Sequence, residues 1–145
     1  MLVPMDEQTT APLLPEDFLF GVATAGFQIE GGYNGRSEPA NNWAPWEREG
    51  RVEPSGAATG FWEDPERQLD LAAAAGLSSF RMSVEWTRIE PSPGEIDRSA
   101  LDGYRRILAS ASERGLEPVV TLQHFTHPAW LGDQPWRDGA GIDRL

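Results

Sequence analysis

The chain has 145 residues, of which 39% are hydrophobic and six are tryptophan. This is enough apolar material for one globular core, so a single domain is the simplest organisation. The formal net charge of −11 argues against nucleic acid or an anionic membrane as a partner, because phosphate groups are bound by clustered Lys and Arg. No cysteine is present, which excludes a disulfide framework, a zinc-thiolate site and a cysteine nucleophile within these residues.

The N-terminal segment, residues 1–16, predicts neither a signal peptide nor a membrane anchor. It lacks a basic region followed by an apolar core, and no apolar run in the chain is long enough to cross a bilayer. We therefore expect a cytoplasmic protein without a membrane partner. Residues 1–16 are expected to form a flexible leader and residues 17–145 the folded part.

Three short segments predict buried β-strands: residues 18–25, 78–84 and 118–123. Each is apolar and rich in β-branched or aromatic residues. Because helices are predicted between the strands, the segments alternate between strand and helix. Such alternation predicts an α/β fold with a parallel sheet and right-handed crossovers.

Two helices carry clear start and stop signals. The first has Asp64 as its N-cap, Pro65 at the first helical position and Gly76 at its end, and the second runs from the N-cap Asp97 to Gly115. One face of the second helix is apolar and consists of Leu101, Tyr104, Leu108 and Ala111. Both helices are therefore expected to cover the sheet.

The loops on the two ends of the predicted sheet differ in length. The returns from helix to strand are short, whereas the loop after the first strand runs from about residue 28 to residue 63. In α/β barrels the active site is built from the loops at the carboxyl ends of the strands. Six residues fall at or just past such ends: Gln28, Glu30, Glu85, Trp86, Gln123 and His124.

Several of these side chains suit a polyol ligand. The amide of Gln28 offers a donor and an acceptor and can bind two neighbouring hydroxyls, and a neutral His124 offers one of each. Aromatic rings provide flat surfaces for the C–H face of a sugar, and the candidates are Trp43, Trp46, Phe125 and Trp130. Each residue alone is more often structural, but their grouping on one face indicates a sugar-binding pocket.

Arg81 lies within a predicted buried strand, where an unpaired guanidinium would be costly. A carboxylate partner is therefore expected. One possibility is a structural salt bridge to Glu30 or Glu85. The other is that Arg81 orients a catalytic carboxylate and keeps it ionised for nucleophilic attack.

Four ordered segments resemble glycoside hydrolase family 1, the family of β-glucosidases and β-glycosidases. They are FLFGVATAGFQIEGG at 18–32, NNWAPWEREG at 41–50, FRMSVEWTRIEP at 80–91 and PVVTLQHFTHPAWL at 118–131. The resemblance covers residues 17 to about 136. It implies a (β/α)8 barrel and retaining hydrolysis of a β-glycoside by two glutamates about 5–5.5 Å apart, without a metal or organic cofactor.

The resemblance also implies roles for four residues. Gln28 would bind two hydroxyls of the glycone sugar, and His124 would bind another. Phe125 would line the same subsite, at a position where the family often has Trp. Arg81 would lie beside the catalytic nucleophile.

The family's two catalytic segments do not occur in these 145 residues. The acid/base is expected in a Thr-x-Asn-Glu-Pro segment after the fourth strand, and the nucleophile in a Thr/Ile-x-Glu-Asn-Gly segment near the seventh, both beyond Leu145. Three strands cannot close a barrel. We therefore expect the N-terminal part of a (β/α)8 barrel, inactive alone, with the C-terminal part of the barrel as a partner. A truncated reading frame, an incomplete gene and a split protein are all compatible with this expectation.

Three other functions are considered. Glu30 and Glu85 could themselves form the carboxylate pair, although nothing marks Glu85 as catalytic. A small non-catalytic sugar-binding module would keep the sugar-binding residues without catalytic carboxylates. A nucleotide-binding domain is disfavoured, because GVATAG at 21–26 lacks the middle glycine of a Gly-x-Gly-x-x-Gly turn.

Overall fold

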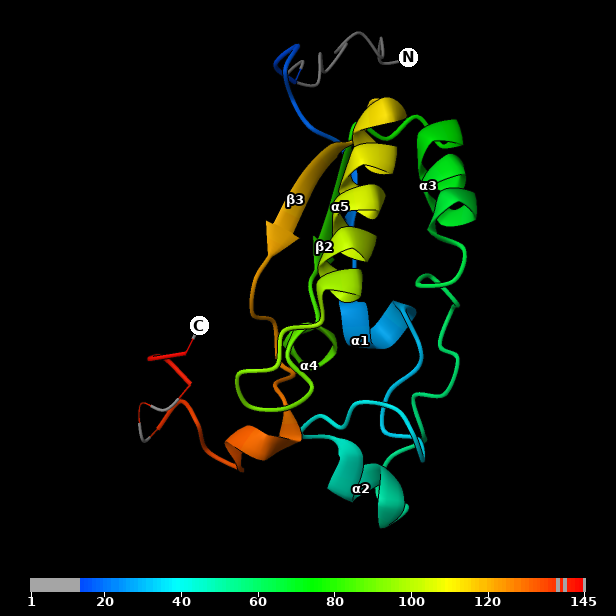
Figure 1. The fold of residues 1–145 in the computed structure, drawn as a ribbon. Coiled ribbons are helices and arrows are strands. Elements are labelled where there is room, and N and C mark those ends of the chain that lie inside the picture. Colours follow the sequence, from blue (N-terminus) through cyan, green and yellow to red (C-terminus); the bar gives the residue numbers. More distant parts are fainter. Residues whose placement is uncertain (1–13, 138, 140, 145) are drawn as a thin grey trace, which may run out of the picture.

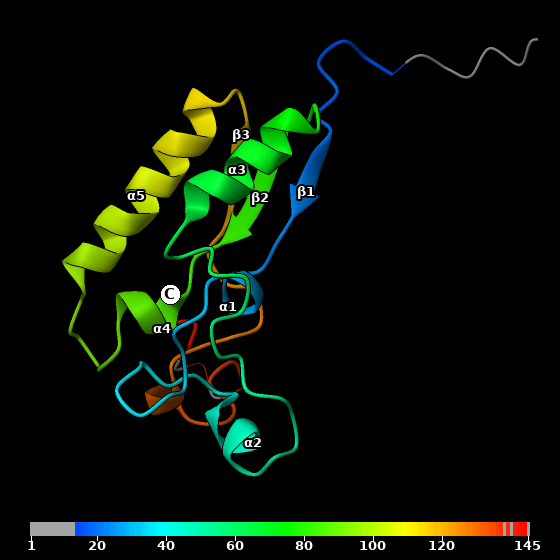
Figure 2. The same ribbon diagram turned by 90° about the vertical axis from the view of Figure 1, so that its right-hand side faces the viewer.

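A computed structural model describes residues 14–137, 139 and 141–144. Within these residues, the strands β1 (Gly21–Ala23), β2 (Ser79–Ser83) and β3 (Glu117–Thr121) form a parallel sheet in the order β1-β2-β3. The helices α3 (Pro65–Ala74) and α5 (Arg98–Glu113) pack together on one face of it (Figures 1 and 2). The predicted alternation of strand and helix in a parallel sheet is confirmed.

Four short helices complete the described elements. They are α1 (Gly26–Ile29), α2 (Ala44–Arg48), α4 (Trp86–Ile89) and the 3-10 helix η1 (Ala129–Leu131). In Figure 1 the strands point downward, and α1, α2 and α4 lie at the lower end, beyond the carboxyl ends of the strands. The long loops therefore lie at the end of the sheet where the sequence predicts a site.

The signals that begin and end the two long helices act as predicted. Asp64 Oδ1 accepts from the Arg67 amide at 3.3 Å, and Asp97 Oδ1 accepts from the amides of Ser99 and Ala100 at 2.8 and 3.1 Å. These bonds satisfy amides that a helix leaves without a partner at its start. Gly76 and Gly115, with φ of +76° and +74°, follow the helix ends in the left-handed conformation that favours glycine.

The core lies between the sheet and the two helices. Phe80 and Met82 of β2 point into it, and the Phe80 ring stacks on Phe61 with centroids 5.7 Å apart. From α5 the core receives Tyr104, Ile107 and Ala111. Leu69 of α3 and Leu116, just before β3, also belong to the core. Leu101 and Leu108, predicted on the apolar face of this helix, are only half-buried, and Ile107 takes the central place.

The two outer strands are exposed, so the prediction of three buried strands is wrong for β1 and β3. Val22 is 39% exposed, and Val119 and Val120 are 44% and 37% exposed. β2 is buried because it has a neighbour on each side, whereas β1 and β3 each pair with β2 alone among the described residues. β1 is also shorter than the predicted 18–25, although Phe20 still bonds to Ser78, just before β2, and to Ser79, the first residue of β2.

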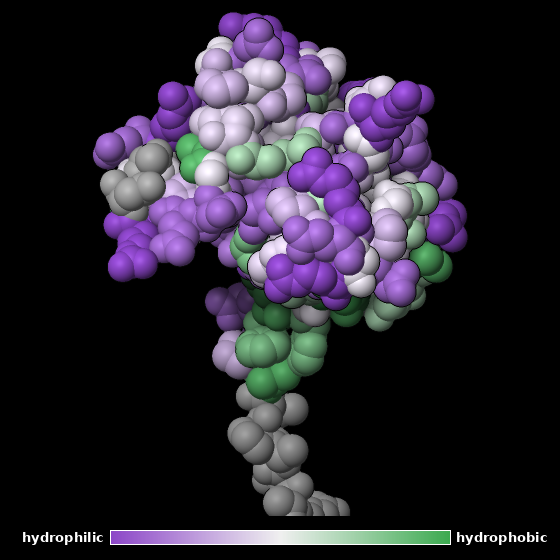
Figure 3. All heavy atoms as spheres, turned by 90° about the horizontal axis from the view of Figure 1, so that it is seen from below, coloured by the Kyte–Doolittle hydropathy of each residue, from purple (hydrophilic) through white to green (hydrophobic). Residues whose placement is uncertain are grey.

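Apolar side chains continue from β1 toward the N-terminus. They are Leu14, Phe18, Leu19 and Phe20, all exposed. Figure 3 shows an apolar region beside the grey N-terminal residues, on a surface that is otherwise largely hydrophilic.

Of the expected leader 1–16, residues 1–13 lie outside the described part of the chain. No helix among the described residues has the length and apolarity needed to cross a membrane.

Candidate glycoside-binding site

The predicted sugar-binding residues come together beyond the carboxyl ends of β1 and β3. A pocket of about 400 Å³ is lined by Phe27, Gln28, Trp43 and Phe125. His124 is the neighbour of Phe125, and their ring centroids lie 5.0 Å apart. The side chains of Gln28 and His124 are both exposed. The structure therefore places two hydrogen-bonding side chains beside an aromatic wall.

The aromatic wall consists of rings from three segments of the chain. Trp43 lies 5.8 Å from Phe27 and 5.9 Å from Phe125, and Trp46 packs edge-on against Trp43 at 5.1 Å. Trp130 was expected in the same group but belongs to another one. It packs against Trp86 at 6.1 Å, and its indole N–H donates to the carbonyl of Glu90.

The loop after β1 is bonded directly to the loop after β3. The amide of Asn42 donates to the carbonyl of His127 at 3.0 Å, and the amide of His127 donates to Asn42 Oδ1 at 2.9 Å. An antiparallel bridge joins Asn41 to Pro128. Since these residues directly precede Trp43 and follow Phe125, the bonds explain why the two rings meet across the pocket.

Glu30 is buried at the end of α1, with 1% of its surface exposed. Its carboxylate accepts from Arg88 Nε at 3.0 Å, from the hydroxyl of Tyr104 at 2.9 and 3.1 Å, and from the hydroxyl of Tyr33. Burial raises the pKa of Glu30, while the charge of Arg88 and the two tyrosine hydroxyls oppose part of this rise. Glu30 is thus held by four donor contacts inside the protein.

Arg88 is the cation of this buried cluster, and the sequence reasoning missed it. Its guanidinium lies 4.5 Å from the Tyr33 ring and 4.0 Å from the Trp62 ring, and it donates to the carbonyl of Gly31 at 2.7 Å. Its spacing, three residues after Glu85, puts both residues on one side of a helical turn, but this signal points to Glu85 and not to Glu30 as the partner. The carboxylate of Glu30 is compensated by this cation, whereas Glu85 is held by uncharged donors.

Glu85 is also buried, with 1% exposed, and begins α4 as its N-cap residue. Its Oε1 accepts from the amide of Phe27 at 3.0 Å, and its Oε2 accepts from the hydroxyl of Thr126 at 2.6 Å. Burial raises the pKa of Glu85 to about 7; the hydrogen bond from Thr126 lowers it, and the nearby charge of Glu30 raises it. Because Glu30 and Glu85 are both enclosed and fully hydrogen-bonded, the geometry argues against a catalytic pair made of these two.

A glycine allows this close arrangement. A Cβ atom at Gly26 would lie 2.8 Å from Glu30 Oε1 and 2.8 Å from Glu85 Cγ. The amide of Gly26 also donates to Ser83 Oγ at 2.7 Å. Gly26, just after the first strand, therefore allows the side chains of Glu30 and Glu85 to pack closely against the backbone. The sequence predicts no phosphate-binding turn at this glycine.

Arg81 has a different environment from the one expected. It alternates with Phe80 and Met82, so it lies on the sheet face opposite α3 and α5. Its Nε donates to Thr121 Oγ1 at 2.7 Å, and no carboxylate among the described residues forms a salt bridge with it. The expected structural salt bridge to Glu30 or Glu85 is therefore wrong, because Arg88 pairs with Glu30 and uncharged donors hold Glu85.

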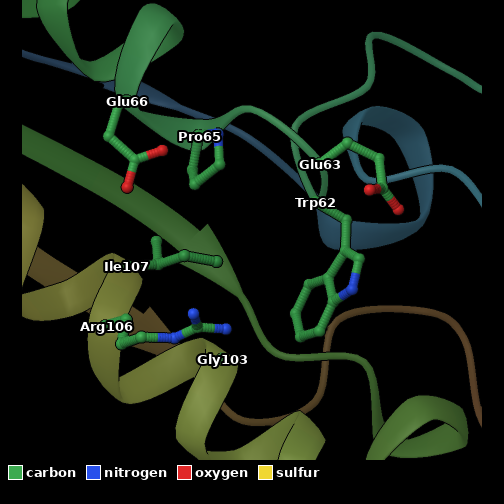
Figure 4. A pocket seen from close by; sticks show the side chains of 7 residues that line it. All are labelled: Trp62, Glu63, Pro65, Glu66, Gly103, Arg106 and Ile107. Carbon is green, nitrogen blue, oxygen red and sulfur yellow. The ribbon is translucent and has the colours of Figure 1, made fainter.

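A second hollow, of about 140 Å³, lies on the helical side of the sheet (Figure 4). It is bordered by Trp62, Glu63, Pro65, Glu66, Gly103, Arg106 and Ile107. Trp62 approaches α5 closely here, since a Cβ at Gly103 would lie 2.7 Å from its ring. This hollow lies on the face of the sheet opposite Arg81 and contains none of the predicted sugar-binding residues. Among the described residues, no three His, Asp or Glu side chains are grouped to hold a metal ion.

Known proteins resemble this chain along nearly its whole length. The profile of glycosyl hydrolase family 1 matches residues 10–144. A 6-phospho-beta-galactosidase of Staphylococcus aureus strain COL is 34% identical over 132 residues, which cover 90% of this chain and 27% of that protein. The chain therefore spans about 27% of the length of the curated relatives that it matches.

Solved structures show the same likeness. The AHE enzyme from Alicyclobacillus herbarius is 32% identical with a TM-score of 0.79, over 90% of this chain and 31% of that one. A beta-glycosidase from Pyrococcus horikoshii is 39% identical with a TM-score of 0.72, over 81% of this chain and 27% of that one. The predicted fold class, part of a (β/α)8 barrel, is confirmed by these likenesses together with the parallel sheet. The chain belongs to glycosyl hydrolase family 1.

Proposed function

We propose that this chain is part of a retaining β-glycosidase and supplies residues that bind the glycone sugar. The observation that carries the proposal is the pocket of about 400 Å³ in which Gln28 borders an aromatic wall at the carboxyl ends of parallel strands. The names of two of these relatives, a 6-phospho-beta-galactosidase and a beta-glycosidase, both specify a β-glycosidic bond, which supports a β-linked glycoside as the substrate class.

Each pocket residue has a distinct part in this proposal. The Gln28 amide binds two neighbouring hydroxyls, and the exposed His124 ring binds another. The rings of Phe125 and Trp43 border the apolar face of the sugar. Because these groups offer hydrogen bonds and aromatic surfaces but no carboxylate, they recognise a polyol without performing the chemistry themselves.

The two glutamates that cleave the glycosidic bond are proposed to lie outside these 145 residues. Glu30 and Glu85 are enclosed by their own hydrogen bonds, so they are unavailable to a substrate. Arg81 lies on the opposite sheet face from the core, where it can meet a carboxylate from another part of the protein and keep it ionised. A cytoplasmic location, expected from the sequence, stays a prediction.

Reading the DNA that follows the codon for Leu145 tests the proposal. An in-frame Asn-Glu-Pro segment within a few dozen codons is the expected result, and the protein carrying it should hydrolyse an aryl β-glucoside. There, Gln28→Ala should lower kcat/KM by roughly a hundredfold, since a hydrogen bond to a charged or partly charged sugar is lost in the transition state.

Gln134→Ala is the matched control, because this exposed glutamine contacts Arg137 and does not border the pocket. Equal effects of the two substitutions would contradict the assignment of Gln28. Tight glycoside binding by the 145-residue chain, with no catalytic segment anywhere in the gene, would instead establish the sugar-binding module.

A further inference from the structure

The carboxylate of Glu85 joins two loops that are far apart in the sequence. One oxygen accepts from the amide of Phe27, and the other accepts from the hydroxyl of Thr126. Phe27 directly precedes Gln28 in the sequence, and Thr126 directly follows Phe125. These are the two loops that carry the proposed sugar-binding side chains. The Glu85 carboxylate therefore bonds to one residue in each of the two loops that border the pocket.

Glu85 is itself fixed in place. Its amide donates to the hydroxyl of Tyr104 at 2.9 Å, and its Cγ is packed against the backbone at Gly26. Because the side chain is buried, its two bonds are shielded from water and charge-assisted when the carboxylate is ionised. The Glu85 carboxylate therefore fixes the positions of Phe27 and Thr126 relative to each other.

The other buried carboxylates make different contacts. Glu30 binds Tyr33, Arg88 and Tyr104, none of which lies in the loop after β3. Glu90 accepts from the Trp86 indole and from the amide of Gly94, each four residues away in the sequence, and pairs with Arg144 at 3.6 Å. Among the described residues, Glu85 is the carboxylate that bonds to both pocket loops.

We propose that Glu85 is a positioning residue that sets the separation between Gln28 on one loop and His124 and Phe125 on the other. The inference rests on the proposed function, because it assigns to Glu85 the geometry of the glycoside site. A side chain displaced by about 1 Å loses much of a directed hydrogen bond, so fixing the two loops to one carboxylate controls how well both grip one sugar ring.

The test compares four forms of the 145-residue chain: wild type, Glu85→Met, Thr126→Val and the control Glu90→Gln. Methionine keeps the size of the side chain and removes both acceptors, while valine removes only the Thr126 hydroxyl. Hydrogen exchange of the Phe27 amide measures how well its hydrogen bond to Glu85 protects it. Chemical-shift titration of the Gln28 side-chain amide with methyl β-D-glucoside reports on binding.

In Glu85→Met we expect the Phe27 amide to exchange at least tenfold faster, while the amides of α5 keep their protection. The glycoside concentration for half-maximal shift should rise by roughly tenfold, as expected for one misplaced hydrogen bond. Thr126→Val should leave Phe27 exchange unchanged and still weaken glycoside binding. Glu90→Gln should change neither quantity. If Glu85→Met fails to fold, Thr126→Val tests the inference through binding alone, and unchanged glycoside binding in that variant overturns it.

The outcomes separate this inference from the proposed function. Unchanged Phe27 exchange in Glu85→Met overturns the inference. Faster exchange with unchanged glycoside binding also overturns it, because Glu85 would then hold the loops without affecting the site. Absence of any glycoside-induced shift in the wild-type chain counts against the proposed function, whatever the exchange of Phe27 shows. Glu85→Gln, added as a fifth form, keeps an acceptor for the Phe27 amide. Wild-type Phe27 exchange and glycoside binding in this variant would support Glu85 as the residue that links the two loops.

Discussion

The guanidinium of Arg88 lies 3.0 Å from the carboxylate of Glu30 and is held between two aromatic rings. The side chains of this pair are 13% and 0% exposed, so little water is available to either charge. A buried ion pair adds little net stability compared with apolar residues, but removing one partner leaves a charge without compensation. The pair is therefore a sensitive point of the fold.

Arg88→Met should lower the free energy of unfolding by about 3–5 kcal/mol, because Glu30 would then be buried without its cation. Urea unfolding followed by tryptophan fluorescence measures this change. Arg105→Met is the control, since Arg105 forms an exposed pair with Asp102 whose loss should cost less than about 1 kcal/mol. Similar losses in both variants would show that Glu30 is stabilised mainly by the tyrosine hydroxyls.

Stability should fall as pH rises from about 4.5 to about 7. The pKa of Glu85 is about 7 in the folded chain against an ordinary value of 4.5, so in this window the folded state holds a proton that the unfolded state has released. Protons bound preferentially by the folded state make unfolding easier as pH rises. The change attributable to Glu85 is on the order of 3 kcal/mol. Glu30, whose pKa is also raised, acts in the same direction.

Glu85→Gln should flatten this pH dependence, and denaturant titrations at several pH values reveal the difference. The groups that act on Glu85 are Glu30 and Arg88 through their charges, and Thr126 and Phe27 through hydrogen bonds. All four remain in the variant. A pH dependence as steep in Glu85→Gln as in the wild type would show that the effect arises elsewhere.

The exposed sheet edges should make the 145-residue chain self-associate. Val120 and Leu122 are 37% and 64% exposed at the β3 side, and an unpaired strand edge with apolar neighbours is a template for further pairing. Replacing both by lysine should reduce the sedimenting oligomers and the binding of a hydrophobic dye. Leu71→Lys, on α3 and 62% exposed, is the control. If it is equally effective, general charge rather than the edge governs association.

Local features of the fold were predictable from the sequence because they depend on neighbouring residues. Asp64 and Asp97 cap their helices, and Gly76 and Gly115 follow the helix ends, since these signals act within one or two turns of the chain. The grouping of Gln28 with Phe125 was also predictable, because the carboxyl ends of parallel strands share one edge of the sheet.

Features that depend on distant partners were not predictable in the same way. An apolar strand has the same sequence pattern whether or not a neighbour covers it, so the exposure of β1 and β3 could not be read from their residues. Choosing Arg88 instead of Arg81 as the partner of Glu30 required their directions in space. Trp130 was placed with the wrong rings for the same reason.

The last prediction distinguishes the two arginines. Arg81 makes one described side-chain hydrogen bond, to Thr121, and is half-buried, so Arg81→Met should cost the 145-residue chain about 1 kcal/mol or less. In a protein that also carries the two proposed catalytic glutamates, the same substitution should lower kcat by roughly a hundredfold with little change in KM, because the cation that orients the nucleophile and keeps it ionised is lost. Without the cation the pKa of the nucleophile should rise, and the acidic limb of the pH–rate profile should move up by about one to three pH units.

Arg106→Met is the control for Arg81→Met. It changes an exposed arginine on α5 and should leave the rate and the pH–rate profile unchanged. A large loss of stability in Arg81→Met, comparable with that of Arg88→Met, would make Arg81 a structural residue, and an unshifted acidic limb would remove its proposed part in catalysis.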